Sequence, residues 1–206
     1  MIFKHIPLGL ISANTYVLAD EDTKEGVIVD VGGDFDKLQS LLEETGVKIQ
    51  KILLTHGHLD HMYASNEARH VLKASVYIHE NDKELYKDSK IRSFYGSIAT
   101  SHLDIDGFLR DDDILTFGKH SIRVIHTPGH TQGSVSFLVD DSFLLSGDTL
   151  FRNSIGRTDH MGGDMQQEIR SIKEKILILP GSVAVFPGHG RPTSIEDEKK
   201  FNSFLQ

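Results

Sequence analysis

The sequence predicts an α/β fold in which strands and helices alternate along a single domain. Short runs of apolar and β-branched residues alternate with segments whose apolar residues recur at helical spacing. Polar residues able to bind metals directly follow several of these runs, where loops leave the edge of a sheet. The length of 206 residues and the hydrophobic content of 38% fit one globular domain that covers residues 1–206.

The first part of the chain predicts three strands followed by a helix. The strands cover 2–6, 15–19 and 27–31, and glycine and asparagine residues that favour turns separate them. A helix is predicted over 34–45, and Gly46 is expected to end it. Its apolar residues at helical spacing are Phe35, Leu38, Leu41 and Leu42.

The alternation continues and then stops. A strand over 49–54, a helix that Ser65 can cap and a strand over 76–78 follow in order. From about 79 to 113 no clear periodicity remains. A stretch of this length fits either a lid or substrate-binding loop, or a plain surface excursion, and we leave both open.

The second half repeats the pattern of strands followed by a helix. The expected strands are 114–117, 121–125, 134–139, 142–145 and 183–186. A long amphipathic helix is predicted over 164–179, and Ser194 begins a last helix. The apolar stripe of the long helix consists of Met165, Ile169, Ile172 and Ile176.

One heptad, Thr55-His-Gly-His-Leu-Asp-His61, closes the apolar run 51–54 and carries four metal-binding side chains. Alternate side chains of an extended backbone share a face, so His56 and His58 can point at one ion. A turn after them would bring Asp60 and His61 toward a second point. We interpret Gly57 as leaving room for the ion and for a bend. Imidazole and carboxylate ligands at this density suit zinc or another first-row divalent metal.

Three further candidate ligands follow strands in the second half. They are His130 in Pro-Gly-His-Thr, Asp148 in Ser-Gly-Asp-Thr and His189 in Pro-Gly-His-Gly. Each follows a glycine directly. Any one of them alone would more often be a turn or capping residue, but together with the heptad they predict a metal site.

Seven ligands are enough for two metals that share one carboxylate. His56, His58 and His130 would hold the first metal, Asp60, His61 and His189 would hold the second, and Asp148 would bridge them. Two such ions lie roughly 3.5–4 Å apart and lower the pKa of a shared water to about 7, which provides hydroxide at neutral pH.

The composition excludes several other classes of function. A net charge of -8 argues against nucleic acid and against an anionic membrane surface as partners. We expect no signal peptide and no membrane span, because no apolar run is long enough. Cysteine is absent, so disulfides and thiolate ligands are excluded, and a cytoplasmic location is favoured.

The four ligand motifs, in this order, resemble the metallo-β-lactamase superfamily, and the resemblance covers nearly the whole chain. It implies a four-layer αβ/βα sandwich with the metals at one edge. Within the superfamily, the seven-ligand set and the stretch from Gly147 to Asp159 are similar to glyoxalase II, the hydroxyacylglutathione hydrolase, in a short single-domain form. β-Lactamases with a Cys ligand are disfavoured because the chain has no cysteine. His58 stands where flavodiiron proteins carry a Glu, which disfavours that branch of the superfamily.

This resemblance implies thioester hydrolysis of the S-lactoylglutathione type by a bridging hydroxide on a binuclear centre. The expected cofactors are two divalent metal ions, with zinc favoured and iron or manganese open. Asp60 would also orient the hydroxide, and Asp148 would bridge the metals as the second catalytic carboxylate. A thiolate with a thiol pKa near ~8.5 can leave without a general acid. We expect a small-molecule substrate and a monomer or small homo-oligomer.

Two departures from glyoxalase II bear on the substrate. The helical C-terminal domain that binds glutathione is not expected in this chain, and Gly190-Arg191 replaces the Glu-Tyr pair after the last ligand. Arg157 stands at the place of a basic substrate-binding residue in the family and could meet a carboxylate or a carbonyl.

Two alternatives remain open. A mononuclear iron persulfide dioxygenase would use only His56, His130 and Asp148 as its ligands. A metal-binding module without catalysis is the other. Outside the ligand motifs, His126 and His160 are candidates to contact a ligand residue.

Overall fold

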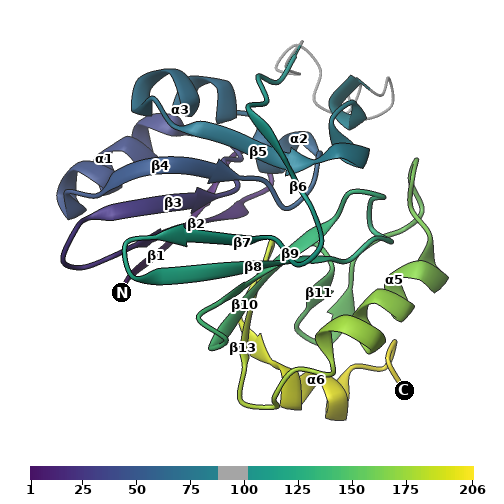
Figure 1. Cartoon of the computed structure of the whole chain (residues 1–206). Coiled ribbons are helices and arrows are strands. Elements are labelled where there is room, and N and C mark those ends of the chain that lie inside the picture. Colours follow the sequence, from purple (N-terminus) through teal and green to yellow (C-terminus); the bar gives the residue numbers. More distant parts are fainter. Residues whose placement is uncertain (88–101) are drawn as a thin grey trace. The chain divides into compact units, whose positions relative to one another are not determined.

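The computed structural model describes residues 1–87 and 102–206, drawn in Figure 1. Residues 88–101, which form the middle of the possible lid, lie outside the described residues. The chain divides into two compact units. Unit 1 comprises Met1–Leu109 and Thr116–His120, and unit 2 comprises Arg110–Leu115 and Ser121–Gln206. The single domain expected from the sequence stays a prediction.

Unit 1 is built on a six-stranded mixed sheet with the order β1-β2-β3-β4-β5-β6. β1, β2 and β3 pair antiparallel, whereas β3, β4, β5 and β6 pair parallel. The strand bounds are β1 Ile2–Leu8, β2 Ala13–Ala19, β3 Glu25–Val29, β4 Lys48–Leu53, β5 Ser75–His79 and β6 Gly107–Leu109. The expected strands are confirmed within a few residues at each end, and β6 is a strand that the sequence did not predict.

The helices of unit 1 connect its parallel strands. They are α1 Phe35–Thr45, the short α2 Leu59–Met62 and α3 Ser65–Leu72. Figure 1 shows α1 and α3 on one face of the sheet. Leu38 and Ala68 pack there against Ile28 and Ile52 of the strands, because parallel strands need a crossover that covers the sheet. Gly46 ends α1 in the left-handed conformation, as expected. Ser65 begins α3 without capping it through its side chain.

The stretch without periodicity begins with two short 3-10 helices, η1 Glu80–Asp82 and η2 Leu85–Lys87. β6 lies toward its end. Asp106, which precedes β6, accepts hydrogen bonds from the Arg69 guanidinium at 2.8 and 2.9 Å and from the Val76 N–H at 2.8 Å. The end of this stretch that leads into β6 is therefore fixed to β5 and to α3.

Unit 2 contains most of a second six-stranded sheet, with the order β14-β13-β10-β9-β8-β7. The bounds are β7 Ile114–Phe117, β8 His120–His126, β9 Val135–Val139, β10 Phe143–Gly147, β13 Ala184–Pro187 and β14 Thr193–Ser194. β10 and β13 pair parallel, whereas β8 with β9, β9 with β10, and β13 with β14 pair antiparallel. A small hairpin of β11 Leu150–Phe151 and β12 Ser154–Ile155 follows β10. These two-residue strands and β14 were not predicted, because such short strands have no periodicity.

The long helix of unit 2 changes its winding partway along. α5 Met165–Ser171 continues as a π-helical turn, η4 Ile172–Ile176. Ile172 and Ile176 lie in the core of this unit, with Ile195 of the last helix, α6 Ile195–Phe201. Ser194 caps α6 by accepting from the Asp197 N–H, as predicted.

The expected apolar stripe of α5 needs one correction. Met165 is exposed, whereas Glu168 is completely buried. Ile169, Ile172 and Ile176 pack in or against the core as the stripe predicted, so only the first turn differs, where Glu168 is buried in place of Met165.

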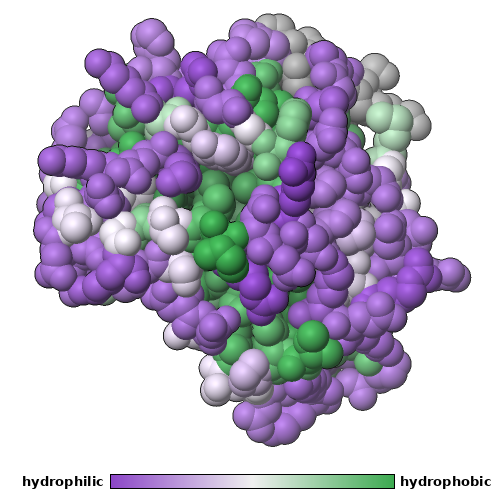
Figure 2. Space-filling model, in the orientation of Figure 1, coloured by the Kyte–Doolittle hydropathy of each residue, from purple (hydrophilic) through white to green (hydrophobic). Residues whose placement is uncertain are grey.

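The surface agrees with the charged composition. The face drawn in Figure 2 is largely hydrophilic, with apolar areas between the polar ones. Among the described residues, no helix combines the length and the hydropathy that crossing a membrane requires.

Candidate metal centre

The heptad lies directly after β4, where a buried carboxylate receives three hydrogen bonds. Asp30, which follows β3 and is 1% exposed, accepts from the Thr55 N–H and the Thr55 hydroxyl, both at 2.8 Å. Its Oδ2 also lies 2.7 Å from Nδ1 of His61. A carboxylate accepts only, so Nδ1 of His61 carries the proton, and Nε2 is the nitrogen that can bind a metal.

The same reasoning fixes the tautomer of His56. Nδ1 of His56 lies 3.0 Å from the Thr55 hydroxyl oxygen. The hydroxyl proton already goes to Asp30, so this oxygen accepts from Nδ1–H of His56. His56 therefore also presents Nε2 as its metal-binding atom.

The four ligand candidates of unit 1 lie close together. The ring centroid of His56 lies 4.8 Å from that of His58 and 4.2 Å from that of His61. Asp60, in the first turn of α2, has Oδ2 3.4 Å from Nε2 of His61. The helical turn after His58 is what carries Asp60 and His61 to their positions.

The structure gives a different reason for Gly57 from the one we inferred. A Cβ atom at this position would lie 2.7 Å from the backbone oxygen of Asp82. The Gly57 N–H donates to Oδ2 of Asp82 at 2.9 Å. The glycine thus lets the loop pack against η1, where a second buried carboxylate holds its backbone.

In unit 2, Asp148 faces both histidine candidates. Its Oδ2 lies 3.7 Å from Nε2 of His130 and 3.7 Å from Nε2 of His189. Ligand atoms that are each about 2.0–2.2 Å from one ion lie roughly 3–4 Å apart, so both distances suit common coordination. The parallel pairing of β10 and β13 places these loops together, and the Gly188 N–H donates to the Gly147 carbonyl at 2.7 Å.

The tautomer of His130 is fixed by a carbonyl. Its Nδ1 lies 2.8 Å from the backbone oxygen of Arg157, which can only accept. Nε2 is therefore the metal-binding nitrogen and is the one that faces Asp148. His160 contacts the same ring, with a centroid distance of 4.9 Å, as we anticipated. His126 instead reaches the backbone oxygen of Gln132, 3.0 Å from its Nε2.

Glu168 is the main residue of the site that the sequence analysis missed. Its Oε2 accepts from the His130 N–H at 2.8 Å, and its Oε1 has no hydrogen-bond partner among the described residues. Burial without a cation raises the pKa of this carboxyl to about 9, and the nearby charge of Asp148 adds to the effect. The sequence did carry a signal for this residue, because a glutamate four positions before Ile172 lies on the apolar side of the predicted helix.

Two glycines allow this close packing in unit 2. A Cβ atom at Gly129, where φ is 149°, would lie 2.3 Å from the backbone of Glu168. One at Gly156 would lie 2.0 Å from the Asp148 carbonyl. The ligand loops are therefore held by backbone contacts that a larger residue would prevent.

Arg157, unlike the candidate ligands, has a largely exposed side chain. Its guanidinium is paired with Asp159 at 3.0 and 3.1 Å, and the side chain is 80% exposed. The pairing raises the pKa of Arg157 and lowers that of Asp159. Its role in substrate binding stays a prediction.

Curated relatives include two hydrolases and a dioxygenase. A probable metallo-hydrolase, YqgX of Bacillus subtilis, is 37% identical over 100% of this chain and 98% of its own length. The hydroxyacylglutathione hydrolase GloC of Haemophilus influenzae is 33% identical, with 97% and 96% covered. The mitochondrial persulfide dioxygenase ETHE1 of Bos taurus is 29% identical, with 93% and 70% covered.

Solved structures resemble the chain over its full length. The BLEG-1 B3 metallo-beta-lactamase superposes with a TM-score of 0.92 at 41% identity, and 99% of each chain is covered. TTHA1623 in a di-iron-bound form gives 0.87 at 35% identity, with 98% of this chain and 100% of that chain covered.

The family model of the metallo-beta-lactamase superfamily matches residues 8–189, a range that includes all seven candidate ligands. The predicted α/β metallo-β-lactamase fold is confirmed by this match and by the solved structures. The chain therefore belongs to the metallo-β-lactamase superfamily.

Proposed function

We propose that this chain is a metal-dependent hydrolase of thioesters, with a substrate of the S-lactoylglutathione type. The observation that carries the proposal is the donor set of each unit, in which the histidine tautomers are already fixed for metal binding by Asp30, Thr55 and the Arg157 carbonyl. The likeness to GloC at 33% identity supports the thioester as substrate class.

We assign the ligands as the motifs suggest. His56, His58 and His130 would hold one ion, and Asp60, His61 and His189 the other. Asp148 would serve both ions, in keeping with the equal distances from its Oδ2 to Nε2 of His130 and of His189. We propose zinc as the metal, while the di-iron form of TTHA1623 keeps iron as an alternative.

When bound, the ions would lower the pKa of a water molecule to about 7 and polarise the thioester carbonyl. Asp60 would orient that water by accepting its hydrogen bond. In the overall reaction the water oxygen bonds to the carbonyl carbon and the C–S bond breaks. The electron pair leaves with the thiolate, which takes a proton from solvent. Arg157 would exchange Asp159 for a carboxylate of the substrate.

The test is metal analysis of protein purified without added metal, together with S-lactoylglutathione turnover. We expect about two metals per chain and hydrolysis that is lost in Asp148→Asn. His70 is an exposed histidine of α3 outside the ligand motifs. The variant His70→Ala is the matched control and should keep both the metal content and the hydrolysis. Full metal content without turnover of any thioester would overturn the proposal.

A persulfide dioxygenase is the second candidate, because ETHE1 of Bos taurus is 29% identical over 93% of this chain. It would need one iron per chain, held by His56, His130 and Asp148. Oxygen consumption with glutathione persulfide, one iron per chain and no thioester hydrolysis would establish it in place of the hydrolase.

β-Lactam hydrolysis is favoured by one observation, the 41% identity to the BLEG-1 B3 metallo-beta-lactamase. The same purified protein can be assayed with a chromogenic cephalosporin. A rate constant above that for S-lactoylglutathione would make the β-lactam the preferred substrate.

A further inference from the structure

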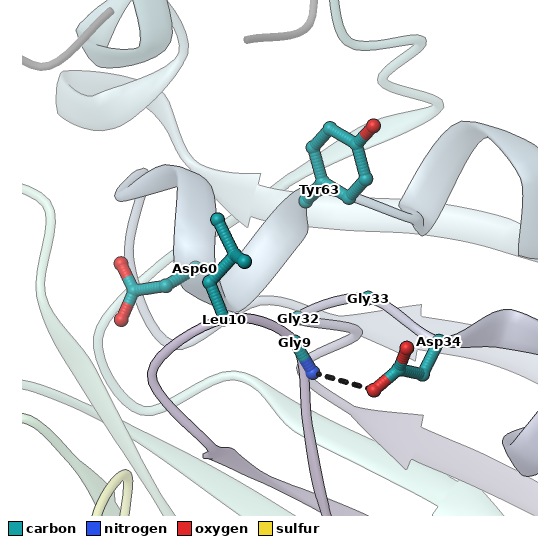
Figure 3. Close-up of a pocket in the computed structure, with 7 residues that line it drawn as sticks. All are labelled: Gly9, Leu10, Gly32, Gly33, Asp34, Asp60 and Tyr63. Atoms are coloured by element: carbon teal, nitrogen blue, oxygen red, sulfur yellow. Dashed lines mark hydrogen bonds between the residues drawn. The ribbon is translucent and has the colours of Figure 1, made fainter. Parts of the chain in front are cut away.

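A pocket of about 250 Å³ lies in unit 1 beside Asp60, as Figure 3 shows. Leu10, from the turn between β1 and β2, and Tyr63, directly after α2, form its apolar walls. Tyr63 is three positions after Asp60, a spacing that places both on one side of a helical turn. A substrate held at Asp60 can therefore reach this pocket.

Backbone contacts build the floor of the pocket. A Cβ atom at Gly9 would lie 2.4 Å from the Gly32 carbonyl oxygen, and one at Gly32 would lie 2.1 Å from the Asp60 carbonyl oxygen. A Cβ atom at Gly33 would approach the Gly9 Cα to 2.9 Å. The Gly9 N–H also donates to Oδ2 of Asp34 at 3.3 Å, drawn as the dashed line in Figure 3. These contacts fix the turn that carries Leu10.

The walls combine apolar surface with negative charge. Leu10 is 72% exposed and Tyr63 is 37% exposed, so a ligand in the pocket would cover apolar surface that water now contacts. Asp34 and Asp60 both line the pocket, but in Figure 3 the carboxylate of Asp60 points away from Leu10 and Tyr63, so Asp34 supplies the negative charge. Lys37 lies 3.1 Å from Asp34, but both side chains are well exposed, so solvent screens this pair.

Size and charge decide which part of a thioester fits. Pockets for drug-sized molecules measure about 300–1,000 Å³, so this one suits a smaller group. The thiol part of a glutathione thioester is a tripeptide with two carboxylates, which is too large for the pocket. The acyl part is small and uncharged in a lactoyl thioester.

We propose that this pocket binds the acyl group and that Leu10, Tyr63 and Asp34 select acyl groups that are short and uncharged. The proposal rests on the thioesterase function proposed above. It makes the three residues determinants of specificity, separate from the metal ligands except where the pocket meets Asp60.

The test compares kcat/KM for the lactoyl, butanoyl and succinyl thioesters of glutathione. We expect the wild-type chain to favour lactoyl over succinyl by about tenfold or more, because the succinyl carboxylate would lie near the charge of Asp34. Leu10→Phe should lower the butanoyl-to-lactoyl ratio by about tenfold, as expected when a pocket loses room for one or two methylenes. Tyr63→Leu should change the same ratio.

Asp34→Asn tests the charge alone. Asparagine also tolerates the left-handed conformation of this residue, where φ is 44°, and can still accept from the Gly9 N–H. We expect the succinyl-to-lactoyl ratio to rise severalfold. Ile11→Ala, at an exposed apolar residue next to Leu10 that does not line the pocket, is the matched control and should leave every ratio unchanged.

The outcomes separate the two proposals. Hydrolysis with the same acyl preferences in the wild-type chain and all pocket variants would overturn the assignment of the pocket and leave the thioesterase standing. Hydrolysis of none of the thioesters would overturn the thioesterase and the pocket assignment with it.

Discussion

At the scale of single residues, buried carboxylates hold the backbone and the rings of the ligand loops. Asp30 orients His61, Asp82 holds the Gly57 N–H, and Glu168 holds the His130 N–H. Each is at most 2% exposed. A hydrogen bond to a buried group costs most when one partner is removed, so these three residues should influence metal binding without touching a metal.

Asp30→Asn should weaken zinc binding about 10–100-fold, the usual effect of losing a carboxylate that orients a ligand histidine. The amide of asparagine would turn a donor toward the Thr55 and His61 donors. Competition titration with a chromogenic chelator measures the affinity. Asp22→Asn, at an exposed aspartate paired with Lys119, is the control. Unchanged zinc affinity in Asp30→Asn would contradict the prediction.

Glu168 predicts a pH dependence of stability in the metal-free protein. The pKa of its carboxyl is 4.5 in an ordinary environment and about 9 in the folded chain. Between these values the folded state keeps a proton that the unfolded state has lost, so stability falls as pH rises from about 4.5 to about 9.

Glu168→Gln should reduce this fall, because the amide does not titrate, while its oxygen can still accept from the His130 N–H. Urea midpoints at pH 5.5 and 8.5, measured with a chelator present, give the comparison. Glu67→Gln, at an exposed glutamate of α3, should change with pH as the wild-type chain does. An equal pH dependence in Glu168→Gln would refute the assignment.

At the scale of elements, the site depends on loops that pack backbone against backbone. Gly129→Ala should lower the free energy of unfolding by at least ~2 kcal/mol more than Gly162→Ala does. Both positions have positive φ, 149° and 86°, but only at Gly129 would the new Cβ meet other atoms, those of Glu168 in α5. Chemical denaturation of the two variants measures the difference, and equal losses would show that backbone conformation alone decides.

The elements also show which parts of the fold local patterns predict. Long strands such as β2 and helices such as α1 were predicted to within a few residues. β2 is buried along its whole length, and α1 buries Phe35, Leu38 and Leu42 at helical spacing. The two-residue strands β11, β12 and β14 were not, because their pairing is decided by neighbours. The change from α5 to the π-helical η4 was also invisible, since Ile172 and Ile176 fit either winding.

At the scale of the whole molecule, each unit has its own apolar core. Unit 1 buries residues such as Leu38 and Ile52, and unit 2 buries residues such as Leu144 and Ile172. We therefore expect metal removal to lower the melting temperature without unfolding the chain. Each zinc ion at 100 times its Kd adds about 2.7 kcal/mol, so two ions add about 5.4 kcal/mol, which corresponds to roughly 10–20 °C for a chain of this size.

Differential scanning calorimetry with and without a chelator measures this shift, and circular dichroism checks that the secondary structure remains. Asp148→Asn should show little shift, because it lacks the carboxylate that both ions would share. A metal-free protein without secondary structure would show that the units do not fold without the ions.

The α/β class, the superfamily and the seven candidate ligands in their order could be predicted from the sequence alone. These follow from hydropathic periodicity and from short motifs, both of which are local. The tautomers of the histidines, the three buried carboxylates that hold the loops and the pocket at Leu10 and Tyr63 became visible only in the tertiary structure. Asp30 accepts a hydrogen bond from Thr55, 25 residues away in the sequence, and Glu168 accepts one from His130, 38 residues away. Contacts at such separations exist only once the sheets have formed, because a residue's own neighbours in the chain do not specify its partner.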